Sequence, residues 1–328
     1  MKKVLLTGAI ALPASVAAQA APTLYGKANV SYQKTTDDNQ DQWEPNSNSS
    51  RLGVKGDAEV TDDLTAVYKA EFEISIDDGD KKGQTFAQRN IYAGVKGNFG
   101  QVVAGKFDTP LKKARGNFDQ FNSLSVSAVK HVLLKTGESK GENRMGNQIM
   151  YTSPKIAGIA QFNASLIPGE EARTDGKDGF ADGKSFSVTA GDKYLKKNKY
   201  FAAVAVDDNV KGADLVRFAA QTKLPSNTKL GVLYQTAKAS DVNDAVSMDS
   251  VGVSVTQAIN SNVVLKAQYM QSEADTDNGQ ENTQFSVGTD YKLNKKTKLF
   301  GYYGRLETEK AATKAKESTI GTGLEVKF

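Results

Sequence analysis

The stretch that decides the fold is SRLGVKGDAEVTDDLTAVYKAEFEISI, residues 50–76. Apolar and charged side chains alternate along it, and successive side chains of a β-strand leave opposite faces. Turn-forming Thr61, Asp62 and Asp63 interrupt the pattern, which then resumes with the same sidedness. This predicts an antiparallel hairpin with one apolar and one polar face. Runs of about ten residues suit a tilted membrane-spanning strand, so we expect the apolar face to meet lipid.

The first twenty residues, MKKVLLTGAIALPASVAAQA, have the pattern of a cleaved secretory signal peptide. Lys2 and Lys3 precede an apolar run from Val4 to Leu12, and Ala18-Gln19-Ala20 forms a cleavage site. The apolar run is too short to span a bilayer, and a retained membrane anchor is the alternative. We therefore expect the mature chain to begin at Ala21.

Composition restricts the class of protein. No later segment approaches eighteen apolar residues, which argues against a helical membrane protein. The hydrophobic content of 39% and mean hydropathy of −0.47 fit both a soluble protein and a barrel that is polar inside. Without Lys2 and Lys3, the 42 basic residues fall to 40 against 38 acidic ones, which gives no case for nucleic acid. The absence of Cys excludes disulfides and thiolate chemistry.

From Thr23 onward the alternating pattern recurs, joined in turn by tight turns and longer polar loops, and we count sixteen strands. An even number of antiparallel strands can close into an up-and-down barrel without free edges. Residues 37–48 are expected to form a polar loop, and residues 107–147 break the rhythm with one short helical piece. Aromatic residues near strand ends predict a belt at the membrane interface, or else ordinary cross-strand packing: Tyr269, Tyr291, Phe300 and Tyr302.

At this point the chain resembles the general porins of Gram-negative outer membranes over nearly its whole length. The similarity is carried by the following segments: TLYGKANVSY at residues 23–32, SSRLGVKG at 49–56, QRNIYAGVKGNFGQVVAGK at 88–106 and NQIMYTSP at 147–154. The final strand adds outward Ile320, Thr322, Leu324 and Val326 and ends in Phe328. In that family a C-terminal aromatic residue is the signal read by the barrel-assembly machinery.

The resemblance implies a trimer of sixteen-stranded barrels in the outer membrane, in contact with its lipid and lipopolysaccharide. It also implies that the third long loop, residues 107–147 here, folds into the lumen as a constriction. The expected organisation is a signal peptide at 1–20 and a single barrel domain at 21–328.

Arg51, Lys69 and Arg89 share the polar parity of neighbouring strands and should stand side by side in the lumen. Such a basic stripe suggests an ion path, and a hydrated wall without selectivity is the alternative. The resemblance places Arg51, Arg89 and Arg144 opposite acidic residues of the infolded loop. That loop is itself net basic, so we expect a weak anion preference, with Asp108 and Asp119 as the acidic partners.

Nothing in the sequence supports catalysis, a metal site or a cofactor. His131 is the only His, and a nucleophile would have to come from Ser123, Ser125 or Ser127, which are better explained as loop caps or as hydroxyls that face the lumen. The leading hypothesis is a porin that passes small hydrophilic solutes and ions by passive diffusion. The alternative is an outer-membrane adhesin or ligand-binding barrel that acts through its surface loops.

Overall fold

The computed structural model describes residues 21–38, 40–78, 83–169, 179–277, 279–311 and 313–328. The predicted signal peptide lies outside the described residues. The elements in chain order are β1 Thr23–Asp37, β2 Asp41–Ser47, β3 Arg51–Thr61, β4 Leu64–Glu73, β5 Ala87–Gly97, β6 Gly100–Asp108, α1 Pro110–Ala114, α2 Ala128–His131, β7 Arg144–Thr152, β8 Ala160–Ile167, β9 Gly183–Gly191, β10 Tyr200–Asp208, β11 Ala213–Lys223, β12 Thr228–Ala239, β13 Met248–Ala258, β14 Val263–Ala274, β15 Gln280–Lys292, β16 Thr297–Lys310 and β17 Thr313–Lys327.

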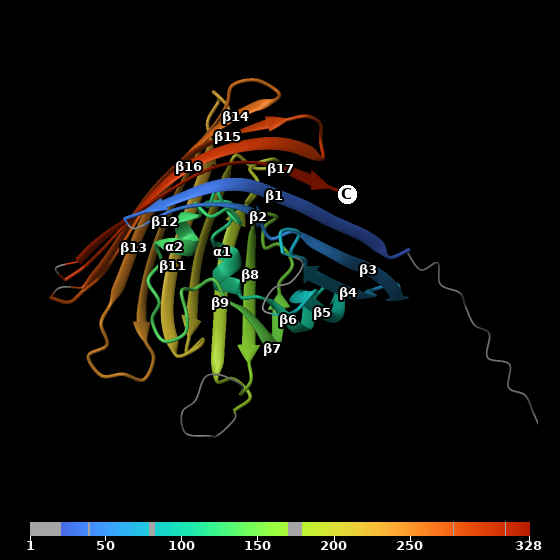
Figure 1. Cartoon of the computed structure of the whole chain (residues 1–328). Helices are drawn as coiled ribbons and strands as arrows, with labels where there is room; N and C mark the ends of the chain where they lie inside the picture. Colours follow the sequence, from blue (N-terminus) through green and yellow to red (C-terminus); the bar gives the residue numbers. More distant parts are fainter. Residues whose placement is uncertain (1–20, 39, 79–82, 170–178, 278, 312) are drawn as a thin grey trace, which may run out of the picture.

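The strands form one closed antiparallel barrel (Figure 1). Neighbours in sequence pair with each other, and β1 closes the ring on β17 from Lys27↔Lys327 to Asp37↔Glu317. β2 and β3 pair with successive parts of β1, and the register slips by one residue at Asn48–Ser50 between them. They therefore share one place in the ring, which has sixteen strand positions. The predicted all-β, up-and-down barrel is confirmed.

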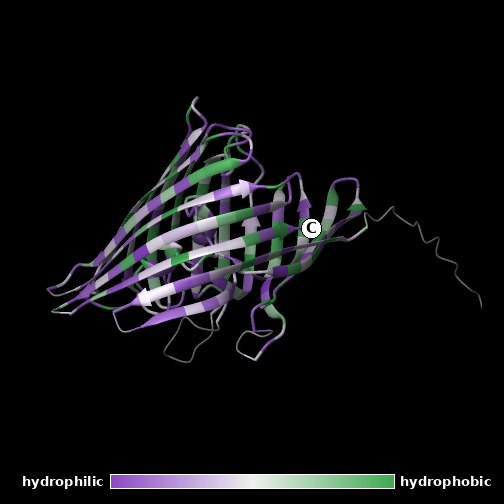
Figure 2. Ribbon diagram, turned by 45° about the horizontal axis from the view of Figure 1, so that its top comes forward, coloured by the Kyte–Doolittle hydropathy of each residue, from purple (hydrophilic) through white to green (hydrophobic). Residues whose placement is uncertain are grey.

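The two faces of the wall are the reverse of those of a soluble sheet (Figure 2). Side chains that point outward are apolar and exposed, whereas those that point inward are mostly polar and buried. Val253, for example, is 50% exposed, while Ser254 beside it is 5% exposed. An apolar exterior around a polar interior is the arrangement expected of a barrel that spans a membrane.

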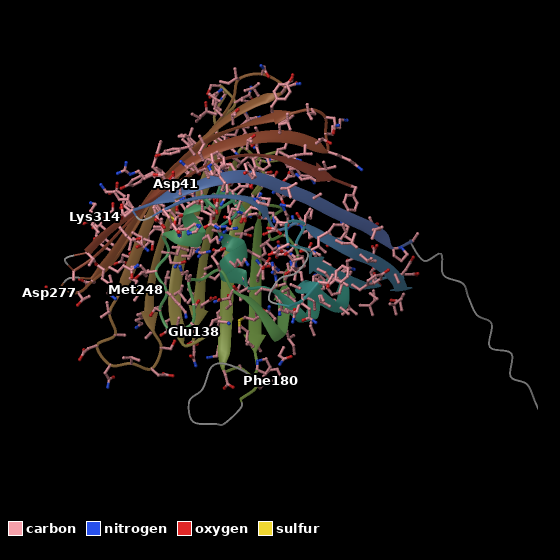
Figure 3. All side chains as sticks on the ribbon, in the orientation of Figure 1. Asp41, Glu138, Phe180, Met248, Asp277 and Lys314 are labelled. Atoms are coloured by element: carbon pink, nitrogen blue, oxygen red, sulfur yellow. The ribbon has the colours of Figure 1, made fainter. Side chains whose placement is uncertain are left out.

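The two ends of the barrel differ. Short turns connect β3 to β4, β5 to β6 and β11 to β12, and Phe328 lies at this end, where its backbone pairs with Gly26. The other end carries the labelled Asp41, Phe180, Asp277 and Lys314 (Figure 3). Outer-membrane barrels have short periplasmic turns and longer outer loops, so the resemblance to that class places the short-turn end on the periplasmic side.

Two expectations from the sequence are wrong. The predicted loop at residues 37–48 contains β2, which pairs with β1 and stacks its Trp43 ring on Tyr32. Phe300 and Tyr302 do not form part of an interfacial belt, because they point into the lumen and are each 4% exposed. Tyr269 and Tyr291 do lie on the outer surface, at 39% and 46% exposed.

The long segment between β6 and β7, residues 109–143, is called the inserted loop below. It contains both helices, α1 and α2, which lie inside the ring of strands (Figure 1), where α1 packs against β8 to β11 and α2 packs against β14 and β15. No helix among the described residues is long and apolar enough to cross a membrane.

Candidate functional site

The inserted loop carries a small apolar core into the polar lumen. Its Phe118 packs with Leu233 and Met270 of the wall, and its Phe121 packs with Phe300 and Tyr302. Full burial of a Phe side chain contributes up to about 3 kcal/mol, so these contacts account for much of the loop's attachment. The lumen-facing aromatic residues of β16 thus help to hold the inserted loop against the wall.

Glycines in the wall make room for this core. A Cβ at Gly252 would lie 2.7 Å from the ring of Phe118, and one at Gly304 would lie 2.5 Å from Val126. Both distances are too short for real carbon contacts, so side chains at these positions would push the loop away from the wall.

Polar groups of the lumen wall satisfy the backbone of the loop. The Oγ of Ser185 accepts a hydrogen bond from the N–H of Leu111 (3.1 Å), and the Oγ of Ser286 donates one to the carbonyl of Val126 (2.9 Å). Further bonds of this kind join the side chain of Gln268 to the N–H of Gln120 and the Oγ of Ser272 to the carbonyl of Val132, and a side-chain bond joins Ser125 to Gln33. Because buried backbone groups are costly to leave unpaired, these bonds fix the path of the loop.

A buried ionic network joins the two ends of the inserted loop. Glu142 accepts from Arg115 at 2.7 Å and from Arg217 of β11 at 2.8 Å. Arg217 is fully buried and also donates to Gln235 (2.9 Å) and to the carbonyl of Leu111 (3.3 Å). One carboxylate is therefore shared by two guanidinium groups, which leaves a net charge of +1, and it ties both arms of the loop to the wall.

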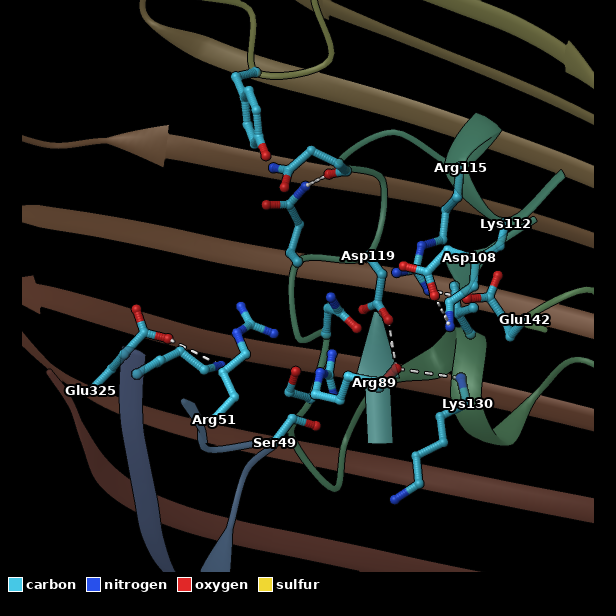
Figure 4. Close-up of a pocket in the computed structure, with 18 of the residues that line it drawn as sticks. Ser49, Arg51, Arg89, Asp108, Lys112, Arg115, Asp119, Lys130, Glu142 and Glu325 are labelled. Atoms are coloured by element: carbon cyan, nitrogen blue, oxygen red, sulfur yellow. Dashed lines mark hydrogen bonds and ion pairs between the residues drawn. The ribbon is translucent and has the colours of Figure 1, made fainter. Parts of the chain in front are cut away.

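A cavity of about 930 Å³ remains beside the loop (Figure 4). Its wall carries an excess of eight positive charges, because fourteen lining side chains are basic and six are acidic. The basic ones are Lys27, Arg51, Lys69, Arg89, Lys112, Arg115, Lys130, Lys140, Arg144, Lys229, Lys266, Lys292, Lys298 and Lys327, and the acidic ones are Glu71, Asp108, Asp119, Glu142, Asp290 and Glu325.

All four predicted basic residues line this cavity, but their charges are compensated to different extents. Arg89 pairs with Glu71 at 2.9 Å and with Glu73 at 2.5 Å, and Lys69 pairs with Glu71 at 3.2 Å. The side chain of Arg51 forms no ion pair or hydrogen bond with any residue that the structure describes. Arg51 therefore presents the less compensated charge to a passing ion.

Arg144 lies where β7 begins, directly opposite Asp108 at the end of β6. Its Nη2 is 3.1 Å from the Asp108 carboxylate, and its Nε donates to the side chain of Asn90 at 2.8 Å. Asp108 also pairs with Lys112 at 3.0 Å. The expected basic and acidic partners therefore meet at the base of the loop, side by side on neighbouring strands.

Asp119 lines the cavity but directs its carboxylate into the loop. It accepts hydrogen bonds from the Oγ of Ser127 and from the N–H of Phe121 (3.1 Å), and burial raises its pKa. Ser127 in turn caps α2 by accepting from the N–H of Lys130, which confirms its predicted role as a cap. The polar contacts of Asp119 thus serve to shape the loop.

The sequence interpretation missed the basic residues near the short-turn end: Lys27, Lys229, Lys266, Lys292, Lys298 and Lys327. The sequence could have indicated them only one strand at a time, because each lies at a position of its strand that faces the lumen. These lysines are dispersed over the sequence and come together only when the ring closes.

His131 offers little chemistry. Burial, with help from Lys130 and Lys140, lowers its pKa to about 4, so it is neutral near pH 7. No group of three or more His, Cys, Asp or Glu within the described part of the chain is placed to hold a metal ion. Absence of catalysis and of cofactors stays a prediction.

The profile of the Gram-negative porin family matches residues 6–311. The chain belongs to the Gram-negative porin family. It is 28% identical to the major outer membrane protein P.IB of Neisseria sicca over 367 residues, with 100% of both chains covered. This porin also shares its fold with an anion-selective porin from Comamonas acidovorans (TM-score 0.80, 19% identity, 94% and 99% covered). The same holds for OmpT of Vibrio cholerae in a trimer form (TM-score 0.64, 16% identity, 94% and 99% covered).

The protein is therefore an outer-membrane porin, a channel through which small hydrophilic solutes and ions diffuse. Its relatives are channels rather than enzymes. The family match and the open, charged lumen do not favour the alternative of an adhesin or a ligand-binding barrel.

Glu142→Gln is expected to loosen the inserted loop, because Arg115 and Arg217 would lose their shared counter-charge. Leaving such buried groups undercompensated costs about 1 to 3 kcal/mol. We expect a lower urea midpoint and a noisier, broader distribution of single-channel conductance. Glu138→Gln is the matched control, since Glu138 lies in the same loop but is exposed and its carboxylate pairs with Lys135 on the surface. Identical current noise in both variants would contradict a clamp at Glu142.

Proposed function

We propose that the inserted loop is the constriction of this porin and that the pore prefers anions. The supporting observation is the excess of eight positive charges around the cavity beside the loop. Residues 21–328 carry a formal charge of only +2, so the remaining surface of the mature chain is net acidic by six. The positive charge is thus concentrated where solutes pass, which raises the local concentration of anions.

Within this constriction, we assign the basic side to Arg51, Lys69, Arg89 and Arg144 and the acidic side to Asp108 and Asp119. Most of these groups are paired with each other or with wall residues, so the preference among small ions should be moderate. Arg51, which forms no ion pair with the described residues, should contribute more to the anion preference than Lys69, Arg89 or Arg144 does.

Arg51→Glu is expected to lower the ratio of anion to cation permeability several-fold at 0.1 M salt. An ion about 7 Å from the side chain feels roughly 0.6 to 2.4 kcal/mol for effective dielectric constants of about 80 to 20, and charge reversal about doubles this. Screening removes much of the effect at about 1 M. The reversal potential across a salt gradient measures the ratio.

Arg305→Glu makes the same change on a residue that does not line the cavity and pairs with Glu307, so it serves as the control. If well-folded Arg51→Glu has the same low-salt reversal potential as the parent, Arg51 does not contribute to the ion selectivity of the pore.

We also propose that residues 21–328 act as a single barrel domain and that three copies assemble in the outer membrane. The apolar outer face would contact lipid, including the acyl chains of lipopolysaccharide, wherever it does not face another copy. Residues 1–20 would be removed during export.

The trimer predicts a heat-sensitive oligomer. Detergent-solubilised protein should run at about three times the monomer mass on a gel without boiling and as a monomer after boiling. Light scattering of the unheated sample should give the same mass. If both measurements show a monomer and the protein still forms open channels in bilayers, the proposed trimer is wrong, whereas the barrel is unaffected.

Phe328 would act as the assembly signal. It is 53% exposed, its N–H and C=O pair with Gly26 (3.2 and 3.1 Å), and its ring lies over the Cα of Gly26. Its side chain is thus accessible on the outer surface while its backbone extends the last strand. The exposed position fits recognition better than a role in packing.

Phe328→Ala keeps the backbone hydrogen bonds and should therefore refold in detergent almost as well as the parent. Its level in the outer membrane should fall several-fold, because the ring read by the assembly machinery is absent. Phe328→Tyr keeps an aromatic ring and should restore the level. Equal outer-membrane levels of the Ala variant and the parent would count against recognition of this side chain.

A further inference from the structure

The periplasmic turn between β9 and β10, residues 192–199, folds back toward the inserted loop. Leu195 in this turn is 5% exposed and packs with Leu111 and Ala114 of α1 and with Phe201 of β10. The carboxylate of Asp192 accepts hydrogen bonds from three backbone N–H groups of the turn at 2.8 to 3.0 Å. The turn is therefore a defined structure docked beneath the constriction.

This docking places Tyr194 at the pore. Tyr194 lines the main cavity and also a small cavity that reaches Asn117 and Gln120 of the inserted loop. The Nζ of Lys193 lies 5.0 Å from the centre of its ring, and that of Lys196 lies 5.9 Å away. An aromatic ring with two ammonium groups thus stands on the periplasmic side of the constriction.

Two further lysines of the barrel wall join this group. Lys229 of β12 donates to the backbone carbonyl of Tyr194 at 3.2 Å, and Lys292 at the end of β15 lines the same cavity. Lys196 and Lys292 are near charged neighbours of Lys229. We call these residues the exit cluster: Lys193, Tyr194, Lys196, Lys229 and Lys292.

The lysines of the exit cluster have no acid of the described chain in direct ion-pair contact, although Asp192 lies close enough to Lys229 to interact with its charge. None of its four lysines forms an ion pair with a residue in the described part of the chain. The nearby Asp290 is shared by Lys266 and Lys298, and Glu325 is shared by Lys27 and Lys327. Asp192 directs its oxygens to the backbone of its own turn. Lys229 and Lys292 thus line the main cavity and Lys193 lines the small one, and none of them is ion-paired with an acid among the described residues.

We propose that the exit cluster is a binding site for small multivalent oxyanions, such as tricarboxylates, at the periplasmic mouth of the pore. An ammonium group is a compact charge with three donors, and several on separate elements can surround one multivalent anion from different sides. The phenol of Tyr194 adds a neutral donor. A monovalent anion would engage fewer of these groups and so bind more weakly.

The proposal rests on the pore function but not on the role of Arg51, which lies in a different part of the cavity wall, on β3. The two can be separated by experiment. Selectivity between K⁺ and Cl⁻ tests the constriction, whereas retention of a multivalent anion tests the exit cluster.

The experiment is single-channel recording in 0.1 M KCl with citrate added to one side at a time. Citrate should block the current of the parent at lower concentration from one side than from the other. In Lys229→Gln/Lys292→Gln the half-blocking concentration from the sensitive side should rise about tenfold, and the difference between the sides should shrink.

Lys295→Gln/Lys296→Gln is the matched control. It removes two charges from an exposed turn at the same end of the barrel, and neither residue lines the cavity. Its half-blocking concentration should stay within about twofold of the parent value. If the wall variant folds poorly, Lys193→Gln/Lys196→Gln in the exposed turn should give the same loss of block.

Three results would overturn the proposal: no block of the parent by citrate, equal block from both sides, or equal loss in the cluster and control variants. If Arg51→Glu leaves the K⁺ to Cl⁻ ratio unchanged while citrate block depends on the exit cluster, the proposed constriction role of Arg51 fails and the site stands. If Arg51→Glu changes the K⁺ to Cl⁻ ratio but citrate block does not depend on the exit cluster, only the proposed binding site fails.

Discussion

The structure depends on backbone hydrogen bonding that leaves no strand edge unpaired. Within a bilayer an unpaired N–H or C=O costs several kcal/mol, so the wall must close, and it does so through the pairing of β1 with β17. Closure of the wall then determines which side chains must be apolar and which can be polar. Each residue faces either lipid or lumen, and the period of two that is visible in residues 50–76 repeats on every strand.

A closed wall with an apolar exterior has no conventional core, and this explains how the inserted loop is built. Its apolar residues must be buried inside a polar tube, where only lumen-facing positions can receive them. The wall supplies aromatic partners at Phe300 and Tyr302 and empty space at Gly252 and Gly304. The small core of this porin therefore lies between the loop and the wall, and the polar anchors and the Glu142 network complete the attachment.

Much of the fold was predictable from local periodicity, because a strand between lipid and water must alternate. The features that the sequence did not predict were missed for physical reasons. β2 escaped notice because it is short, because Pro45 is unusual in a strand, and because its outward face, Trp43, Pro45 and Ser47, shows little apolar alternation. Phe300 and Tyr302 were misassigned because strand position alone does not reveal what the lumen side contacts. The basic residues at Arg51, Lys69 and Arg89 lie close in sequence and could be grouped by parity, whereas Lys229 and Lys292 meet through ring closure and through a turn that docks on α1.

Position in the lumen alone does not determine what a charged residue does to a passing ion, because compensation by neighbours matters as much. Arg89 and Arg51 line the same cavity, but two carboxylates within 3 Å of Arg89 cancel most of its field at the distance of a passing ion. Arg217 is an extreme case, since it is fully buried, shares Glu142 and acts on the shape of the loop. A charge in this pore thus either holds the structure together or acts on the solute, according to whether an acid lies within reach. By that criterion we assign the lysines of the exit cluster to the second group, whereas the paired charges that hold the inserted loop in place belong to the first.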